Sequence, residues 1–433
     1  MRAGSDEVAP APVEAAAPLL AAPPGVAGAA GVLMWQAVLG ERDAPLGYRF
    51  FLSEAAAVRA GGAAASQGVD AWLIHQVSAL SPAWRRQRRI FLELDAGSLD
   101  VEALARLGGQ GVTLILEPAP AGAALMGALA ELRASGFSVF LSVRAGAPRW
   151  PGAVIGLADG LALRFGGESP ASIEAAVEAL AADHPGASWC ALELPTVDDL
   201  VRARRLGCVA ATGSFVNAHS ACLGGRFSAD GLRVTSLLSK LRQGAEIREM
   251  AGVLKQDVAL SYRLLRYVNA AAWGMTTPIN SIEHAMLMLG RRPLYRWLML
   301  LLLAGAPRAA LTEVRGEATL VRARFMELLG ESLSVSQRDE LFVLGMLSRL
   351  DTVLQVPALR VLDTLPMSDT VRAALGDPAA ADSPYAPYLA LARAWDSGDF
   401  AAVQAACERL GLSPEAATRR HLQAFEWVLE NGQ

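Results

Sequence analysis

The side chains that most often carry catalysis or bind metals are few and dispersed in this sequence. Five histidines are spread over the chain, and none of them precedes an aspartate. Four cysteines occur without CxxC pairing, which predicts buried thiols in a reducing compartment rather than a zinc site or disulfides. No phosphate-binding loop, dinucleotide-binding motif or nucleophile elbow lies in a fitting context. We therefore expect neither a metal nor a cofactor.

Positively charged side chains gather in one part of the chain. Twelve basic and five acidic residues lie between Val216 and Arg308, whereas the whole chain, with 39 basic and 43 acidic residues, has a net charge of only -4. The overall balance indicates neither a nucleic-acid nor an anionic-membrane partner. The local excess fits either a solvated face, which is the ordinary case, or a surface that binds an acidic partner or nucleic acid. The candidate surface residues are Arg263, Arg266, Asn269, Arg291 and Arg292.

The first half of the chain alternates short apolar runs with helix-like stretches. Eight strands alternating with helices predict a closed parallel α/β barrel of the TIM type rather than an open sheet. This barrel would occupy residues 31–216, which is compact for the fold. The expected strands are residues 32–38, 47–53, 89–95, 112–118, 138–144, 160–165, 188–194 and 208–215.

The second half, residues 232–433, has helical periodicity throughout and predicts an all-α domain. Its clearest stretch is 255–290, which reads as two amphipathic helices joined by a turn. Leu260, Leu264 and Val268 fall on one face of the first helix, and Ser281 is a plausible N-cap of the second. Polar Asn269 lies beside the apolar face, and we expect it to cap its own helix or to tie the turn to it.

Two further segments lack periodic patterns. Residues 1–30, rich in Ala, Pro and Gly, predict a disordered leader, and residues 217–231 predict a linker of small and polar residues. Prolines interrupt any secretory signal, and the most apolar run, Trp297 to Ala304, is too short to span a bilayer. We expect no membrane insertion and a cytoplasmic protein.

The order of strand motifs in the first half resembles the EAL domain, a barrel that hydrolyses the bacterial second messenger cyclic di-GMP. The resemblance implies two divalent cations, held by carboxylates and an amide at the strand ends, which activate the attacking water. It is carried by Gln36, Val38, Gly47, Tyr48, Glu117, Gly136, Phe137, Gly146, Thr196, Gly207, Gly213, Ser214 and Phe215.

At the positions that the EAL resemblance assigns to metal chemistry, this chain holds mostly other residues. Arg49 replaces the name-giving glutamate, Glu93 replaces an asparagine, and Glu117 alone matches a ligand glutamate. Arginines facing two carboxylates predict salt bridges that close the barrel mouth, or else a pocket that grips a phosphate. The other altered positions are Val143, Arg144, Ala162, Arg164 and Pro195.

The stretch 255–290 resembles the core of the HDOD domain, a helical module related to the HD phosphohydrolases. In such hydrolases a His–Asp pair binds metal, but the corresponding residues here are Ser348 and Arg349. The resemblance therefore implies loss of that metal chemistry. It is carried by Asp257, Leu260, Leu264, Leu265, Val268, Asn269, Ser281, Ile282, Ala285, Leu289 and Gly290.

Together the two halves are similar to the EAL and HDOD two-domain family of bacterial signalling proteins. This resemblance implies a degenerate EAL-type α/β barrel followed by an all-α HDOD domain. The expected function is non-catalytic signalling through a protein partner, in cyclic di-GMP-related control of motility or attachment. Two alternatives stay open: a sensor that binds cyclic di-GMP without cutting it, and a weak phosphodiesterase that uses Glu93 and Glu117.

Overall fold

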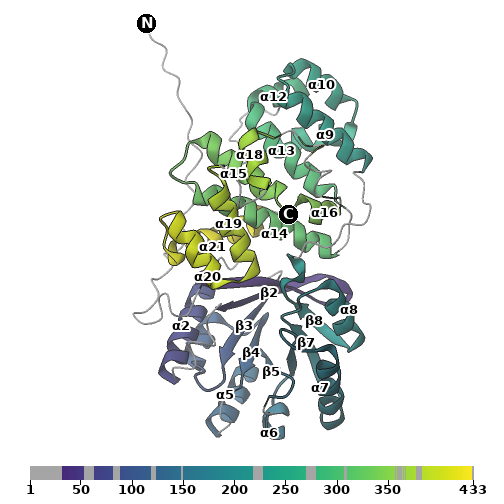
Figure 1. Ribbon diagram of the computed structural model, residues 1–433. Coiled ribbons are helices and arrows are strands. Elements are labelled where there is room, and N and C mark those ends of the chain that lie inside the picture. Colours follow the sequence, from purple (N-terminus) through teal and green to yellow (C-terminus); the bar gives the residue numbers. More distant parts are fainter. Residues whose placement is uncertain are drawn as a thin grey trace.

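The fold has a barrel in its first half and helices in its second (Figure 1). The computed structural model describes residues 32–52, 63–80, 88–118, 123–147, 150–217, 228–269, 279–306, 310–355, 357, 363, 365, 367–376 and 383–431. The expected leader, residues 1–30, lies outside the described residues, as does most of the expected linker 217–231.

Eight strands close into one barrel in chain order, which confirms the predicted barrel. One detail of the prediction is wrong, because the first strand, β1, runs antiparallel to both β2 and β8, and only the other neighbours are parallel. The cause is the short η1 turn, Glu41–Asp43, between β1 and β2: a tight turn joins antiparallel strands, whereas parallel strands need a long crossover. The strands are β1 Leu33–Leu39, β2 Pro45–Leu52, β3 Arg89–Asp95, β4 Val112–Glu117, β5 Ser138–Val143, β6 Gly160–Arg164, β7 Ser188–Leu192 and β8 Cys208–Thr212.

Helices cover the outside of the parallel strands. Their starts follow ordinary capping chemistry: the side chains of Asp100, Ser169 and Thr196 each accept a hydrogen bond from a backbone N–H three residues later. After β8 the chain turns at η2, Ser214–Val216, so the strand ends before the predicted 215. These helices are α2 Ala63–Ala79, α4 Val101–Leu107, α5 Ala123–Ala134, α6 Gly152–Ile155, α7 Pro170–Asp183 and α8 Val197–Arg205.

The described residues from 228 onward contain helices and no strand, which confirms the predicted all-α half. Ser281 caps α12, which confirms its predicted role, and Asp257 caps α11. No helix in the described ranges is both long and apolar enough to cross a bilayer. The helices are α9 Ala229–Arg242, α10 Ile247–Lys255, α11 Val258–Val268, α12 Ile282–Leu289, α13 Arg291–Ala304, α14 Ala310–Leu329, α15 Val335–Leu347, α16 Leu350–Leu354, α18 Asp369–Leu375, α19 Ala386–Ser397, α20 Phe400–Arg409 and α21 Pro414–Asn431.

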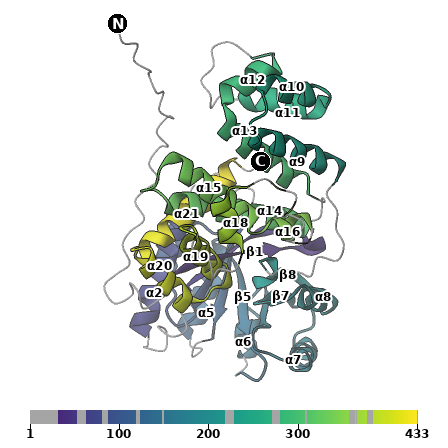
Figure 2. The same cartoon turned by 45° about the horizontal axis from the view of Figure 1, so that its top comes forward.

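The helical half packs on the barrel at the outer face of β1 and β2 (Figures 1 and 2). The ring of Phe425 on α21 lies 4.7 Å from the Trp35 ring and 4.8 Å from the Tyr48 ring, measured between centroids. The Tyr48 hydroxyl donates a 2.6 Å hydrogen bond to Glu317 on α14. The outer face of the β1–β2 ribbon is thus buried by α14 and α21, and these contacts join the two halves.

Candidate functional site

Charged side chains meet inside one end of the barrel, and strand alternation explains why. The side chains of Phe91 on β3, Ile115 on β4 and Ala162 on β6 belong to one buried cluster inside the barrel. Alternate residues of a strand point to the same face, so the side chains two positions further on also point inward. These residues are Glu93, Glu117 and Arg164, at or near the carboxyl ends of their strands.

Arg164 is the centre of this barrel mouth and is 4% exposed. Its guanidinium donates to Glu93 Oε1 at 2.6 Å from Nη2 and to Ser142 Oγ at 3.0 Å from Nε. The same group also forms ion pairs with Glu117 and Glu193. Three carboxylates therefore converge on one buried guanidinium.

Arg49 closes the cluster from the β2 side and is 2% exposed. Its Nε donates to Glu93 Oε2 at 2.9 Å, and its Nη1 donates to Gln36 Oε1 at 3.1 Å. The guanidinium carbon lies 4.3 Å from the centre of the Phe51 ring. Glu93 is held between Arg49 and Arg164, one for each carboxylate oxygen, and the predicted salt bridges at the mouth are present.

The electrostatics of the mouth keep these groups charged. Burial alone raises the pKa of Glu93, but the guanidinium groups of Arg49 and Arg164 outweigh it and hold that pKa well below its usual value. Burial lowers the pKa of Arg164, and the carboxylates of Glu93, Glu117 and Glu193 more than reverse this shift. Each charge is thereby stabilised by its neighbours rather than by water.

Glu193 was missed by the sequence reasoning, which considered Pro195 instead. Leu192 points into the barrel, so simple alternation would turn the next side chain outward. Glu193 instead has φ of +60°, a left-handed conformation that redirects its carboxylate into the mouth. Gly166 leaves room for it, because a Cβ at Gly166 would lie 2.7 Å from Glu193 Oε2. Pro195 itself is exposed.

The other barrel residues named from the EAL resemblance lie in different parts of the barrel. Ala162 is fully buried in the barrel interior beneath Arg164, and Val143 is half-buried against the larger core. Arg144 lies at the exposed rim, where its Nη1 donates to the Gly166 carbonyl at 3.1 Å and its Nη2 is 3.8 Å from Glu193. The mouth thus gathers Arg49, Arg144 and Arg164, but not Val143 or Ala162, around the carboxylates.

This arrangement does not fit a pair of divalent cations. Cations such as Mg²⁺ need oxygen ligands that converge on an open position. In the mouth that position is filled by guanidinium groups, which already bind the available carboxylate oxygens of Glu93. Within the described ranges, no three His, Cys, Asp or Glu side chains are placed to hold a metal ion.

Ser348 and Arg349, which the HD resemblance aligns with a metal-binding His–Asp pair, lie at the contact between the two halves. Arg349 is 1% exposed, and its guanidinium donates to Asp396 at 3.1 Å and to the Val216 carbonyl, directly after the barrel, at 3.2 Å. Arg322 donates to Ser348 Oγ at 2.9 Å and also binds Asp396. These positions therefore serve the joint between barrel and helices.

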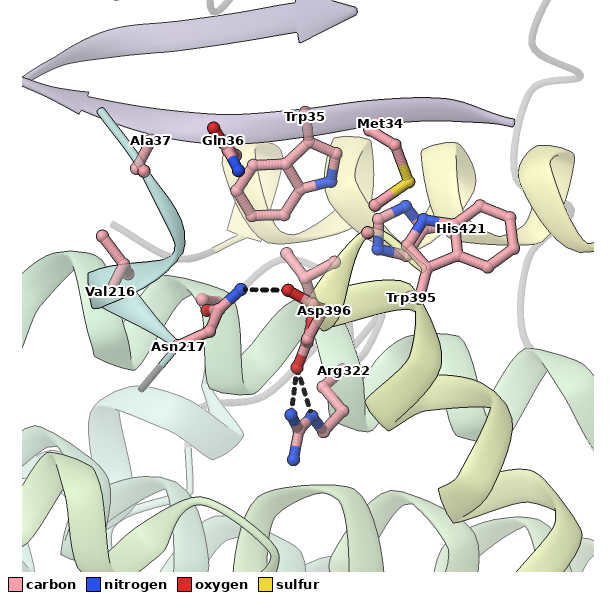
Figure 3. A pocket seen from close by; sticks show the side chains of 14 residues that line it. Met34, Trp35, Gln36, Ala37, Val216, Asn217, Arg322, Trp395, Asp396 and His421 are labelled. Carbon is pink, nitrogen blue, oxygen red and sulfur yellow. Dashed lines mark hydrogen bonds and ion pairs between the residues drawn. The ribbon is translucent and has the colours of Figure 1, made fainter. Parts of the chain in front are cut away.

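A small cavity of about 30 Å³ adjoins this joint, and Figure 3 shows its lining. Trp35, Trp395 and His421 each place a buried ring nitrogen there without a hydrogen-bond partner in the described structure. Burial lowers the pKa of His421 to about 4, although the Asp396 carboxylate opposes this shift. A space of this size is large enough for a water molecule but too small for a nucleotide.

Two of the candidate partner-surface residues, Asn269 and Arg291, form hydrogen bonds within the helical half. The Asn269 side chain donates to the Ile279 carbonyl and accepts from the Ile279 N–H, both at 2.8 Å, which confirms its expected role of tying the turn to its helix. Arg291 donates to the Leu241 and Ala245 carbonyls, near the end of α9. Arg263, Arg266 and Arg292 are exposed.

Comparison with known proteins finds a family match in part of the helical half. Residues 232–359 match the HDOD domain family. Among curated proteins the chain is 28% identical over 197 residues to the uncharacterized protein YuxH of Bacillus subtilis, which covers 44% of this chain and 46% of that protein. It is 28% identical over 176 residues to the cyclic di-GMP phosphodiesterase CdgJ of Vibrio cholerae, covering 40% of each chain. The chain thus spans less than half the length of either relative.

Solved structures with some similarity include EAL proteins. The Bacillus subtilis YkuI protein, with an EAL domain and in complex with cyclic di-GMP and calcium, has a TM-score of 0.36 and 18% identity, covering 44% of this chain and 54% of that one. The PaMucR phosphodiesterase in complex with cyclic di-GMP has a TM-score of 0.35 and 17% identity, covering 42% and 94%. The family match and the strand topology together describe this chain: a closed α/β barrel followed by an HDOD domain.

Proposed function

We propose that the protein is a non-catalytic signalling protein in cyclic di-GMP-related regulation and that it acts by binding a protein partner. The observation that carries this proposal is the ion-pair cluster of the barrel mouth, in which Arg49 and Arg164 enclose Glu93. A metal-dependent phosphodiesterase needs carboxylates that are free to hold cations, because the cations activate the attacking water. Here a cation would first have to displace two buried guanidinium groups.

The HDOD domain supports the same proposal. Its Ser348 and Arg349 stand where the HD resemblance expects a metal-binding His–Asp pair, and neither side chain suits a divalent cation. Both are buried and bonded to neighbours in the joint between the halves. Metal-dependent hydrolysis at this position would also require breaking the joint.

The direct test is incubation of the purified chain with cyclic di-GMP and Mg²⁺ or Mn²⁺, followed by chromatography of the nucleotide. We expect the nucleotide to stay intact in wild type and in Glu117→Ala alike. The Vibrio cholerae relative, named as a cyclic di-GMP phosphodiesterase, is the positive control. Turnover by wild type that disappears in Glu117→Ala would overturn the proposal.

The sensor alternative predicts binding without hydrolysis. Arg49 and Arg164 are poor candidates to grip a phosphate, since both are buried and already bonded to carboxylates. Only Arg144 is substantially exposed, with 47% of its side-chain surface accessible. Calorimetry with cyclic di-GMP separates the two functions: we expect no heat, whereas binding that is lost in Arg49→Ala or Arg144→Ala would favour the sensor.

We assign the protein partner to the surface of α11, which exposes Arg263, Arg266 and Tyr262. The Tyr262 side chain is 64% exposed, an unusual position for a large apolar ring, and aromatic and arginine side chains are enriched at interfaces. Affinity capture with wild type and with Arg263→Glu/Arg266→Glu tests this assignment. We expect a specific partner to be lost in the double variant and kept by Arg205→Glu, a charge reversal on the exposed face of α8. Identical capture by all three proteins would refute the assignment.

A further inference from the structure

A second pocket lies in the helical half, away from the barrel mouth. Its walls come from α9, α13, α15 and the segment that leads into α18, and its volume is about 220 Å³. Helix α13 contacts both α9 and α15, and α15 contacts α18, so the pocket lies among helices that pack directly on one another (Figure 1). It therefore has walls on several sides.

Four arginines line this pocket, and they differ in how they are bonded. Arg291 is committed to backbone carbonyls at the end of α9, and Arg296 forms a two-pronged ion pair with Glu327, at 2.8 and 3.1 Å. The side chains of Arg242 and Arg292 form no hydrogen bond or ion pair with any residue that the structure describes. Two guanidinium groups are thus available to a ligand.

The acidic groups of the pocket do not neutralise these two arginines. Glu340 accepts a 2.7 Å hydrogen bond from the Tyr385 hydroxyl. Asp339 lies near Arg292 but forms no ion pair with it within 4.0 Å, and burial raises its pKa, with Arg296 and Arg292 acting in the opposite direction. The arrangement leaves an excess of positive charge facing the pocket.

The rest of the wall is largely apolar. Leu241, Val343 and Val371 line it and are buried or half-buried, and Met367 lies beside them. The phenol of Tyr295 also lines the pocket, where burial raises its pKa to about 12 and the nearby charge of Arg242 acts against this shift. Apolar walls with a few convergent polar groups are typical of small-molecule sites.

We propose that this pocket binds a small organic phosphate, with Arg242 and Arg292 binding the phosphoryl oxygens and the apolar wall contacting the organic body. Guanidinium groups bind both carboxylate and phosphoryl oxygens through paired hydrogen bonds. A phosphate monoester carries a charge of about -1.5 to -2 at neutral pH, which matches two unpaired arginines better than the single charge of a carboxylate does. The site is independent of the barrel mouth and of the proposed partner surface.

Calorimetry on the full chain tests this proposal with phenyl phosphate, inorganic phosphate and benzoate. We expect phenyl phosphate to bind best, because inorganic phosphate lacks the organic body and benzoate lacks the second charge. Arg242→Gln and Arg292→Gln should each weaken phenyl phosphate binding by about tenfold or more, as expected for loss of a charge-assisted hydrogen bond. Arg205→Gln, the same change on the exposed face of α8, should leave the affinity unchanged.

A measurement without variants provides a second check. Phenylglyoxal modifies accessible arginines, and mass spectrometry reads the modified positions. Phenyl phosphate should protect Arg242 and Arg292 from this reagent but leave the exposed Arg205 reactive. Three results would overturn the site: absence of saturable phenyl phosphate binding, equal loss of affinity in Arg205→Gln, or equal protection of all three arginines. Tighter binding of benzoate would overturn its assignment to phosphates.

Discussion

Arg164 and Glu93 form a buried ion pair inside the barrel, with Nη2 and Oε1 at 2.6 Å and both groups largely removed from water. The other oxygen of the same carboxylate is bound by Arg49. Removing one member of such a cluster is costly, because the partner is left charged in a place that water does not reach. The pair should therefore contribute measurably to the free energy of unfolding.

Arg164→Met tests this directly. It keeps the bulk of the side chain but leaves three carboxylates without their shared cation, so we expect a loss of about 3 to 5 kcal/mol in the free energy of unfolding. Urea denaturation followed by circular dichroism measures it. Arg106→Met is the matched control, because the Arg106–Glu102 pair is exposed and should contribute less than about 1 kcal/mol. Equal losses in the two variants would show that the mouth is not stabilised by its ion pairs.

A divalent cation should partly replace the missing guanidinium. In Arg164→Ala the carboxylates of Glu93, Glu117 and Glu193 surround the vacated space, and Mn²⁺ accepts carboxylate ligands. We expect Mn²⁺ to raise the thermal midpoint of this variant and to leave wild type unchanged. Arg164→Ala/Glu117→Gln removes one carboxylate and should lose the effect. If wild type responds as strongly as the variant, the cation binds elsewhere.

Phe425→Ala should loosen the contact between barrel and helices. The Phe425 ring packs against Trp35, Tyr48 and Phe50 with centroids 4.7, 4.8 and 5.7 Å away. Deleting a buried phenyl ring costs about 3 to 5 kcal/mol, and here the gap opens between the two halves. Chemical denaturation measures the loss, and small-angle scattering measures any separation of the halves. Phe425→Leu, which keeps an apolar contact, should lose less, and equal effects of both changes would contradict this account.

Asp396→Asn should weaken the joint between the two halves, because this carboxylate holds Arg349, which reaches the Val216 carbonyl at the end of the barrel. Arg322 and Arg349 both bind this carboxylate. Burial raises its pKa, but the two guanidinium groups lower it by more, so the pKa lies below its usual value. Without the negative charge, buried guanidinium groups repel one another, and we expect a loss of about 3 to 5 kcal/mol. Calorimetry should then resolve two melting transitions in place of one. Asp198→Asn, on the exposed start of α8, is the control, and a single unshifted transition in Asp396→Asn would disprove the coupling.

His421 should make stability depend on pH in the mildly acidic range. Burial lowers its pKa to about 4 in the folded protein, from 6.5 for the ordinary group, while Asp396 acts in the opposite direction. Below pH 6.5 the unfolded chain therefore binds a proton that the folded chain does not, so stability is lost as the pH falls towards 4. The full effect is about 3 kcal/mol at the lower end of this range.

Urea denaturation between pH 7 and pH 5 measures this slope before most carboxylates titrate. His421→Gln should flatten the slope over that range, whereas His284→Gln, a change at an exposed position of α12, should leave it as in wild type. A slope that persists in His421→Gln would assign the pH dependence to other groups.

Local sequence patterns were sufficient for the elements and for part of the mouth. The positions of Glu93, Glu117 and Arg164 in predicted strands lead to the expectation of salt bridges at the barrel mouth, and these ion pairs are present. Asn269 could be assigned to its turn because it interrupts a periodic helix beside an apolar face. Such inferences hold because they depend on residues within one or two turns of each other.

Alternation failed at Glu193, where a left-handed backbone turn reverses the direction of the side chain. The left-handed conformation favours glycine, and a glutamate at this position gives no indication of it. Asp396 and Arg322 were also missed, since they lie 74 residues apart and meet only when α19 packs against α14. Contacts of this kind depend on how helices pack, which local periodicity does not specify.

The sequence by itself determined the alternating strands and helices of the barrel, the helical second half and the presence of arginines and carboxylates at the strand ends. Only the tertiary structure decided what those arginines do. Arg164 and Arg49 pair with Glu93 inside the barrel, and Arg349 joins the HDOD domain to the end of the barrel. The physical reason is that a charge can be buried only where folding brings its partners within hydrogen-bond distance, and those partners come from separate elements of the chain.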